Sequence, residues 1–345
     1  MAERGLLDLI ISCLPDLSYR EKITLCEALG DESDLLQKSG IEALIGRALN
    51  AQDVDSSRLT AERAAGKARA RGINMVSWHS PLYPPLLREI YDPPVLLFFR
   101  GKLPDPENPL VAVVGTRKPS PASSAQAFEI ARGLGRGGIS VVSGLAFGID
   151  ACAHRGNIEG GAPTVAVLGS GVDEVYPSSN RVLARRILET GGALISESPP
   201  GMGPRKWTFP ARNRIISGLS RGVLIVEAPQ KSGALITARF ALDQNRDLWA
   251  ASSGVEYHSS AKLAPEWGKR FGFFDKRGTS KLAEDGAVII KTASDILEAW
   301  NITAPEREPA PEQGPALAAS LAASLGVKLQ ISDVLMSLIV LVSAV

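Results

Sequence analysis

The sequence has 345 residues, 45% of them hydrophobic, which allows one large domain with one or two small ones and a sizeable core. Its 38 lysine and arginine residues nearly balance its 37 aspartate and glutamate residues, giving a formal net charge of +1. This balance excludes a polycation, so a nucleic-acid site would have to be a local basic patch.

Residues 1–78 are predicted to form a small helical domain. Apolar residues recur there at three- and four-residue spacing, in four stretches separated by short polar breaks. Acidic residues interrupt the first apolar run and no small-residue cleavage site follows, so we do not expect a signal peptide. The three scattered cysteines, Cys13, Cys26 and Cys152, argue against a disulfide framework or a zinc site and are typical of a cytoplasmic protein.

Residues 79–110 are expected to form a connector. The segment is rich in proline, which disfavours long regular elements. One extended apolar piece, Val95–Phe99, predicts a strand within it.

Residues 111–301 are predicted to form an α/β domain. Apolar strand candidates alternate there with amphipathic helical stretches, and the strands occupy 111–115, 139–144, 164–169, 193–197, 222–228, 247–252 and 287–291. Continuous apolar strands separated by helices indicate a doubly wound, mostly parallel sheet that is covered on both faces. In such sheets ligands bind outside the carboxyl ends of the strands, so functional residues are expected just after each strand.

The last part of the chain is predicted to contain a linker and a terminal helix. Residues 302–318 are rich in proline and acidic residues, which is typical of a linker. Residues 319–345 form an apolar helical stretch that we expect to pack on the body or on a partner. Its last apolar run is too short to span a bilayer.

Four loops that follow strands, and one basic segment, provide the candidate site residues. The first strand ends in "GTRKPS", where a strand, a tight turn and a helix N-terminus make a cradle typical of phosphate sites. The basic segment places cations around the aromatic residues Trp207 and Phe209, a combination suited to single-stranded nucleic acid. The residues singled out are Gly115, Thr116, Arg117, Ser143, Gly144, Lys206, Phe209, Arg212, Arg214, Lys231, Ser232 and Gly233.

Each of these loops also has a purely structural interpretation. Taken singly, Ser143 and Ser232 are better explained as a turn residue and a helix N-cap. The run "RNR" is equally compatible with arginines that form ion pairs with the body of the protein. The functional interpretation depends on several loops meeting in one groove.

Candidates for catalysis and for metal binding are few. Four acidic residues lie at or beyond strand ends, but no spacing marks two of them as a general acid/base pair: Asp150, Asp173, Glu197 and Glu227. His154 is predicted to be a buried, hydrogen-bonded helix residue rather than a base. No histidines are paired at metal-ligand spacing, and the dinucleotide fingerprint and the P-loop are both missing. We therefore predict no catalytic residue, no metal and no cofactor.

The ordered motifs resemble the DNA-processing protein A family (DprA, also called Smf). The resemblance covers roughly residues 80–300 and is carried by "VAVVGTRKPSP", "VVSGLAFGIDACAH", "TVAVLGSGVDEVYPSSN", "GGALISESPPG", "FPARNRIISGLS" and "VEAPQKSGALITARFA". It implies an extended Rossmann-like domain that binds single-stranded DNA without sequence preference. The helical N-terminal part is similar to the sterile-alpha-motif-like domain of many members.

The resemblance also implies partners and site residues. Members form homodimers that load the RecA recombinase onto single-stranded DNA and displace single-strand binding protein, in natural transformation (competence) and DNA recombination. Arg117 becomes the leading phosphate contact, and Asn213 joins Lys206, Phe209 and Arg212 as a residue of the "FPARNR" motif.

Three departures from the family pattern bear on these expectations. Phe147 stands where the family usually has an arginine, which removes a cation and offers a stacking surface. The segment 252–276 is longer and richer in aromatic residues and lysines than the usual loop, which affects the dimer geometry. Residues 319–345 are too few for the winged-helix module of many members, so we predict it to be absent or incomplete.

An enzymatic alternative uses the same Rossmann variant. Phosphoribohydrolases that cleave nucleoside monophosphates carry a catalytic glutamate in a PGGxGTxxE stretch. The corresponding segment here, "EAPQKSGALITAR", has no glutamate after the glycine. We therefore predict a binding protein rather than an enzyme.

Overall fold

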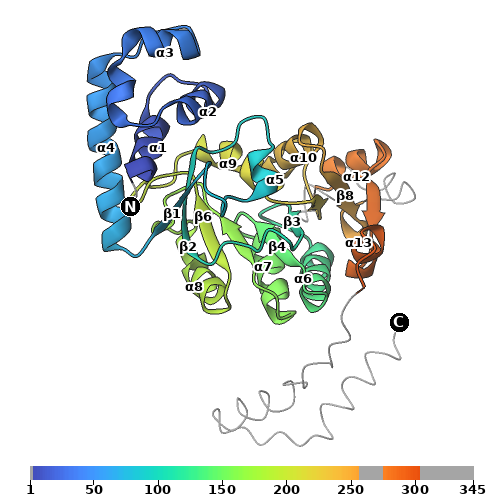
Figure 1. Cartoon of the computed structure of the whole chain (residues 1–345). Coiled ribbons are helices and arrows are strands. Elements are labelled where there is room, and N and C mark those ends of the chain that lie inside the picture. Colours follow the sequence, from blue (N-terminus) through green and yellow to red (C-terminus); the bar gives the residue numbers. More distant parts are fainter. Residues whose placement is uncertain (1–2, 256–274, 304–345) are drawn as a thin grey trace, which may run out of the picture. The chain divides into compact units, whose positions relative to one another are not determined.

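The computed structural model describes residues 3–255 and 275–303 (Figure 1). The terminal helical segment predicted at 319–345, nearly all of the linker and most of the unusual segment 252–276 lie outside these residues. The predictions about the dimer geometry and the winged helix fall on those parts.

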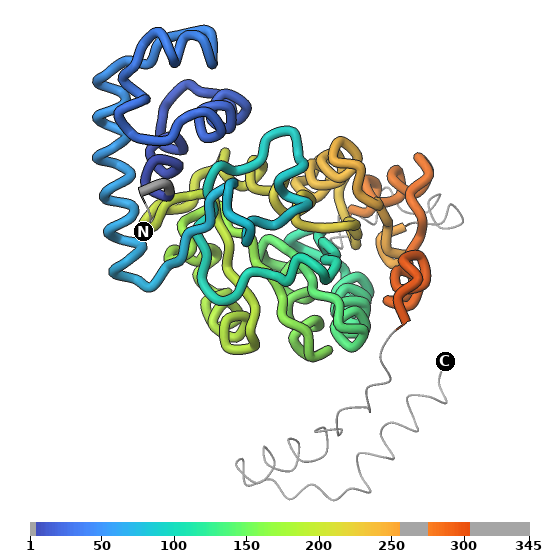
Figure 2. The backbone as a smooth tube through the Cα atoms, viewed as in Figure 1, coloured from blue at the N-terminus to red at the C-terminus, as the bar shows by residue number. Residues whose placement is uncertain are grey.

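The N-terminal part is helical, as expected. It consists of α1 (Glu3–Cys13), α2 (Tyr19–Ala28), the short 3₁₀ helix η1 (Glu32–Leu36), α3 (Lys38–Ile45) and α4 (Ala51–Ala70). Helix α2 begins at a capping box, in which Ser18 and Glu21 satisfy each other's backbone N–H groups. Figure 2 shows the backbone leaving α4 and entering the edge of the sheet.

A nine-stranded sheet forms the body, in the order β1-β2-β6-β5-β4-β3-β7-β8-β9. Its strands are β1 (Asn74–Ser77), β2 (Leu96–Gly101), β3 (Leu110–Val114), β4 (Ser140–Ser143), β5 (Val165–Val167), β6 (Ala193–Ser196), β7 (Gly222–Ile225), β8 (Asp247–Ala251) and β9 (Val288–Ile290). The strands β3 to β9 pair with one another in parallel, as predicted.

Two antiparallel strands extend this sheet. The predicted strand in the connector is present as β2, which pairs antiparallel with β6. Residues 74–77, which the sequence analysis placed in the helical domain, instead form β1 and pair with β2. A four-residue strand carries too few residues for a readable period, and its partner residues in β2 lie 19 to 25 positions further along the chain.

Helices cover both faces of the sheet (Figure 1). Alternate residues of β3 point to opposite faces: Val111 and Val113 join one apolar core, and Ala112 and Val114 join another. The helices are α5 (Pro85–Arg88), α6 (Pro121–Arg136), α7 (Ile149–Glu159), α8 (Arg181–Glu189), α9 (Thr208–Gly218), α10 (Gly233–Asp243), α12 (Arg277–Glu284) and α13 (Ala293–Ala299), with short 3₁₀ turns η2 (Ser178–Asn180) and η3 (Ser252–Gly254). Residues of α9 and α10 belong to the core of one face, and residues of α6, α7 and α13 to the core of the other.

The strand order creates a topological switch point at β3. From β3 the chain builds β4, β5 and β6 on one side and then returns to place β7 on the other. The loops that follow β3 and β7 therefore diverge and leave a crevice at the carboxyl ends of the strands, where open α/β sheets bind ligands.

Candidate functional site

A cavity of about 850 Å³ lies at this switch point. The loop after β3, the loops after β4 and β5, helix α9 and the start of α10 all contribute to its wall. The lining residues are Val114, Gly115, Thr116, Arg117, Lys118, Ala146, Asp150, Tyr176, Lys206, Phe209, Pro210, Arg212, Asn213, Ile216, Pro229, Ser232, Gly233, Ala234, Thr237 and Asp275. The structure thus brings together nine of the thirteen residues singled out from the sequence.

Helix α9 contributes one continuous stripe to the cavity. Phe209, Arg212, Asn213 and Ile216 follow one another at helical spacings of three, one and three residues, which places them on one face. The Phe209 ring packs close to Gly169, just after β5, since a Cβ atom there would lie 3.0 Å from its Cδ1. The ring of Tyr176 lies 5.5 Å from that of Phe209 at an angle of 47°.

Arg212 forms part of the cavity wall and is almost fully buried. Its Nη1 donates to the carbonyl oxygen of Gly144 at 3.0 Å and also to that of Val167. Gly144 is required for this approach, because a Cβ atom there would lie 2.5 Å from Nη2 of Arg212. Burial lowers the pKa of Arg212 to about 10, with Asp150 opposing the shift and Arg117 adding to it. The guanidinium therefore stays charged at neutral pH.

Three further cations at the cavity are exposed: Arg117, Lys118 and Lys206. Within residues 3–255 and 275–303, none of them forms an ion pair. The guanidinium carbon of Arg117 lies 5.8 Å from the centroid of the Phe209 ring, so this cation is held against an aromatic face. The cavity therefore presents positive charge whose counter-ion is not supplied by the described part of the protein.

The N-terminus of α10 opens into the cavity through Ser232, Gly233 and Ala234. Ser232 is the N-cap residue, yet its hydroxyl caps no backbone N–H and has no hydrogen-bond partner among the described residues. Asn213 donates its side-chain amide to the carbonyl oxygen of Gly233 at 3.0 Å, which ties α9 to α10. Unpaired N–H groups and the helix dipole make such a terminus favourable for an anion.

Two carboxylates line the cavity, and both are engaged. Asp150 accepts hydrogen bonds from the backbone N–H groups of Gly144 and Ala146, at 3.1 and 3.3 Å. Its burial raises the pKa of the Asp150 carboxyl, while Arg212 opposes the shift. Asp275 accepts hydrogen bonds from Arg277, which lower the pKa of the Asp275 carboxyl.

Four residues singled out from the sequence do not line the cavity. The hydroxyl of Ser143 donates to the carbonyl oxygen of Val113 at 2.7 Å and stabilises adjacent strands, which agrees with its structural interpretation. Gly144 acts indirectly, through the room it leaves for Arg212. Lys231 is exposed just outside the wall. Arg214 points away from the cavity.

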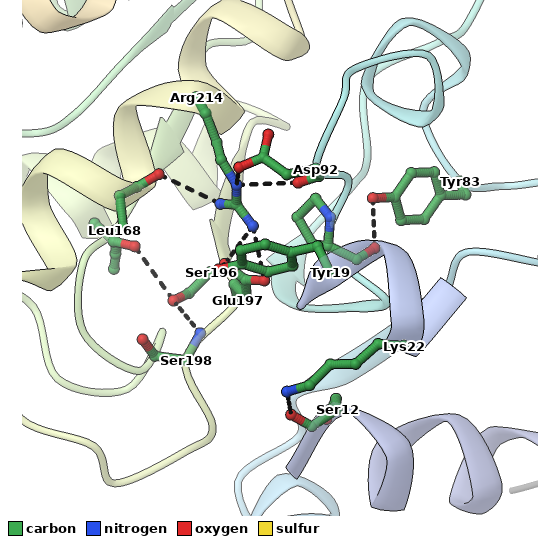
Figure 3. A network of polar contacts seen from close by, with 12 residues as sticks. Ser12, Tyr19, Lys22, Tyr83, Asp92, Leu168, Ser196, Glu197, Ser198 and Arg214 are labelled. Atoms are coloured by element: carbon green, nitrogen blue, oxygen red, sulfur yellow. Dashed lines mark hydrogen bonds and ion pairs between the residues drawn. The ribbon is translucent and has the colours of Figure 1, made fainter. Parts of the chain in front are cut away.

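Arg214 is the centre of a polar junction between the helical domain, the connector and the sheet (Figure 3). Its Nη2 donates to both carboxylate oxygens of Glu197 at 2.9 Å, and its Nε lies 3.0 Å from the Asp92 carboxylate. The guanidinium also lies 4.3 Å from the centre of the Tyr19 ring. Burial alone would lower the pKa of Arg214, but the charges of Glu197, Tyr19 and Asp92 together raise it. Part of the "RNR" run thus has the ion-paired role that was left open.

The remaining candidate acids and His154 stabilise the fold. Asp173 pairs with Arg71 of the segment after α4, and Glu227 accepts hydrogen bonds from the backbone and hydroxyl of Ser120. His154 is buried in α7 and bonds through Nδ1 to the Thr164 hydroxyl at 2.8 Å, as expected for a core histidine.

The sequence analysis did not select four polar residues of the wall: Lys118, Tyr176, Thr237 and Asp275. Two of them carried a usable signal. Lys118 adjoins Arg117, and Thr237 lies four residues after Gly233 on the same face of α10. Tyr176 and Asp275 lie in irregular segments, where no period indicates a direction.

The described part of the chain holds neither a metal cluster nor a membrane-spanning helix. No group of three or more His, Cys, Asp or Glu side chains in residues 3–255 and 275–303 could hold a metal ion. None of the helices in those ranges has both the length and the apolar character that a membrane span requires.

Comparison with known proteins gives consistent matches. The family model described as DNA recombination-mediator protein A matches residues 74–301. The Synechocystis protein Smf is 48% identical over 221 residues, which is 63% of this chain and 51% of Smf, so the match spans about half of that relative. The Bacillus subtilis DNA processing protein DprA is 37% identical over 68% of this chain and 74% of its own.

Two solved structures are also similar. DNA processing protein A of Streptococcus pneumoniae aligns with a TM-score of 0.69 and 30% identity, covering 86% of this chain and 98% of that one. The Helicobacter pylori protein, whose structure concerns its single-stranded DNA binding mode, aligns with a TM-score of 0.53 and 27% identity over 66% and 95% of the two chains.

Proposed function

The chain belongs to the DNA recombination-mediator protein A family, and from this premise we propose that it binds single-stranded DNA, without sequence preference, across the cavity at the switch point. The backbone phosphates contact Arg117, Lys206, Arg212 and the N-terminus of α10. Phe209 offers its ring to a base. Its relatives include a DNA processing protein with a single-stranded DNA binding mode, which supports this assignment.

The observation that carries the proposal is the charge balance of the cavity. Four cationic side chains line it, and both lining carboxylates are already engaged by the protein. A net positive, concave surface at a helix N-terminus favours a polyanion. Phosphate contacts of this kind carry no base information, so binding is expected to be independent of sequence.

The aromatic residues at the wall favour a single strand over a duplex. Cations that track a backbone, combined with rings that stack on bases, are typical of proteins that bind unpaired strands. The bases of a duplex are paired and stacked on one another, so they cannot reach Phe209. Duplex DNA is therefore expected to bind more weakly.

We propose that this role is not enzymatic. Asp150, which would be the natural base in the cavity, is buried and holds two backbone N–H groups. Helix α10 has no glutamate after Gly233 to act on a bound nucleotide. Hydrolysis of a nucleoside monophosphate is the alternative that this proposal rejects.

The family description as a recombination mediator supports a further step. We propose that the protein acts as a homodimer in the cytoplasm and loads RecA recombinase onto the bound strand, in exchange for single-strand binding protein. Natural transformation and DNA recombination are the processes that need such a step.

Replacing Arg117 tests the site directly. Arg117→Ala is expected to weaken binding to oligonucleotides of any sequence and to reduce the slope of log affinity against log salt by about one, because one phosphate contact is lost. Arg136→Ala is the matched control, since Arg136 is an exposed arginine at the end of α6, away from the cavity. RecA loading is expected to fall together with DNA binding.

The measurement is a salt-titrated gel shift with single- and double-stranded oligonucleotides. If Arg117→Ala bound like the Arg136→Ala control at every salt concentration, the phosphate site would be misplaced. If the unaltered protein bound no oligonucleotide, single-stranded DNA binding itself would be excluded.

A further inference from the structure

The loop between β4 and α7 is held rigidly at the rim of the cavity. Asp150 fixes its backbone through Gly144 and Ala146, and the side chain of Asn180 donates to the carbonyl oxygens of Leu145 and Ala146 at 2.9 and 3.3 Å. Leu145 has a φ of 55° although it is not a glycine, and it is fully buried. A conformation of this kind persists only where the surroundings enforce it.

This loop presents one large side chain to solvent. Phe147 is 48% exposed, which is unusual for a phenyl group on such a constrained loop. Its two neighbours place it beside the site: Ala146 lines the cavity, and Gly148 abuts the loop after β3. A Cβ atom at Gly148 would lie 2.5 Å from the Thr116 carbonyl oxygen and 2.8 Å from the Arg117 carbonyl carbon. Phe147 therefore stands at the rim next to Arg117.

A second exposed ring lies in the cavity wall. Tyr176 is 45% exposed, and its ring is supported by that of Phe209 at 5.5 Å. Phe209 itself is only partly exposed, with Gly169 behind it and Arg117 near its face. Of the two rings in the cavity wall, that of Tyr176 is thus the more accessible to a ligand.

Resting on the proposed function, the geometry points to Phe147 and Tyr176 as two stacking platforms for unpaired bases of the strand whose phosphates contact Arg117. The occupant is a nucleobase because Phe147 adjoins the loop of Arg117 and Tyr176 lines the same cavity as the cations that select a polyanion, and every base has an aromatic face to stack. A rigidly held ring loses little conformational freedom on binding, which favours its use as a platform.

The test uses variants of the full chain and fluorescence anisotropy of a labelled oligothymidine, measured over a series of salt concentrations. Phe147→Ala and Tyr176→Ala are each expected to weaken binding about fivefold or more, the lower end for loss of one base stack. The salt slope is expected to stay unchanged, because no charge is removed. Tyr176→Phe keeps the ring and is expected to bind like the unaltered protein. Phe147→Leu keeps apolar bulk without a ring and is expected to bind weakly.

An oligonucleotide with abasic sites distinguishes stacking from other contacts. The unaltered protein is expected to bind it less tightly than the ordinary oligonucleotide, and the double variant Phe147→Ala/Tyr176→Ala is expected to show a smaller difference, because Phe209 alone remains to stack on a base. Tyr91→Ala is the matched control, because Tyr91 is an aromatic residue 85% exposed outside the cavity wall.

The outcomes separate this inference from the proposed function. Steep salt-dependent binding that is unaffected by both alanine substitutions, or by removal of bases, would overturn the platforms and leave the phosphate site standing. Failure of the unaltered protein to bind any single strand would overturn the proposed function first. Equal losses in the Tyr91→Ala control would also overturn the platforms.

Discussion

Arg212 and Arg214 lie two residues apart on α9, both are almost fully buried, and their surroundings are opposite. Arg214 has two carboxylates and an aromatic ring around it. Arg212 has carbonyl oxygens, the engaged carboxylate Asp150 and a second arginine, Arg117, around it; burial lowers the pKa of Arg212, and Arg117 adds to that shift. Residues two positions apart on a helix point in directions that differ by about 200°. The same motif therefore sends Arg212 to the cavity and Arg214 to the junction.

The difference shows what each cation does. At the junction the positive charge is compensated within the protein, so removing it leaves carboxylates without a partner and affects stability. At the cavity the positive charge exceeds what the described residues compensate, so we propose that it attracts an external anion. On this proposal the degree of compensation, rather than burial, separates the structural arginine from the DNA-binding one.

The largest expected effect comes from breaking the junction. Arg214→Ala is expected to lower the free energy of unfolding by about 3 kcal/mol, because it leaves two carboxylates without their partner. This value is the low end for breaking a buried ion pair, since Glu197 and Asp92 retain about 30% exposure. Arg117→Ala, at the cavity, is expected to change it by less than about 0.5 kcal/mol. Urea unfolding of both variants measures this contrast, and equal costs for the two substitutions would contradict it.

The next largest effect concerns the protonation of His154 and the pH dependence of stability. Burial, with a smaller contribution from Arg212, lowers the pKa of His154 to about 3. An unfolded histidine titrates near 6.5, so between these values the unfolded chain binds more protons and acid favours unfolding. This contribution to stability is complete above pH 6.5 and is expected to fall by about 2 kcal/mol on going to pH 5.

His154→Asn isolates that contribution. Asparagine does not titrate, and its amide can replace Nδ1 as the donor to Thr164. Unfolding measured between pH 7 and 5 is expected to show a flatter pH dependence for the variant than for the unaltered protein. Parallel curves for the two would show that folding does not lower the pKa of His154, which would contradict the effect expected from its burial.

The fold could be predicted further than the site. Strands β3 to β7 are continuous apolar runs because both of their faces are buried, and that pattern is visible in the sequence. β1 escaped prediction because its stability depends on pairing with β2. For the site, the sequence placed Phe209, Arg212 and Asn213 in one motif, but the common helix face that they share came from the structure.

The role of Arg214 could not be read from its own neighbourhood. Its partners Glu197 and Asp92 are 17 and 122 residues away in the chain, so only the fold determines that they compensate it. Tyr176 was missed for a related reason, since it lies in an irregular segment and its direction follows from packing against Phe209.

The smallest effect concerns the ring at the junction. Tyr19 contributes its aromatic face to Arg214 and donates a long hydrogen bond to Glu197 at 3.4 Å. Tyr19→Leu removes the ring and is expected to cost about 1 kcal/mol of unfolding free energy, as for a partly desolvated cation–π contact. Tyr19→Phe keeps the ring and is expected to cost less than half as much, because so long a hydrogen bond contributes little. Urea unfolding distinguishes the two, and equal costs would assign the effect to the hydroxyl.

Single-stranded DNA binding is expected to be unchanged in both variants. A shift in DNA affinity would mean that α9 transmits strain from Arg214 to Arg212, so the junction and the cavity would act as one unit rather than as two independent regions.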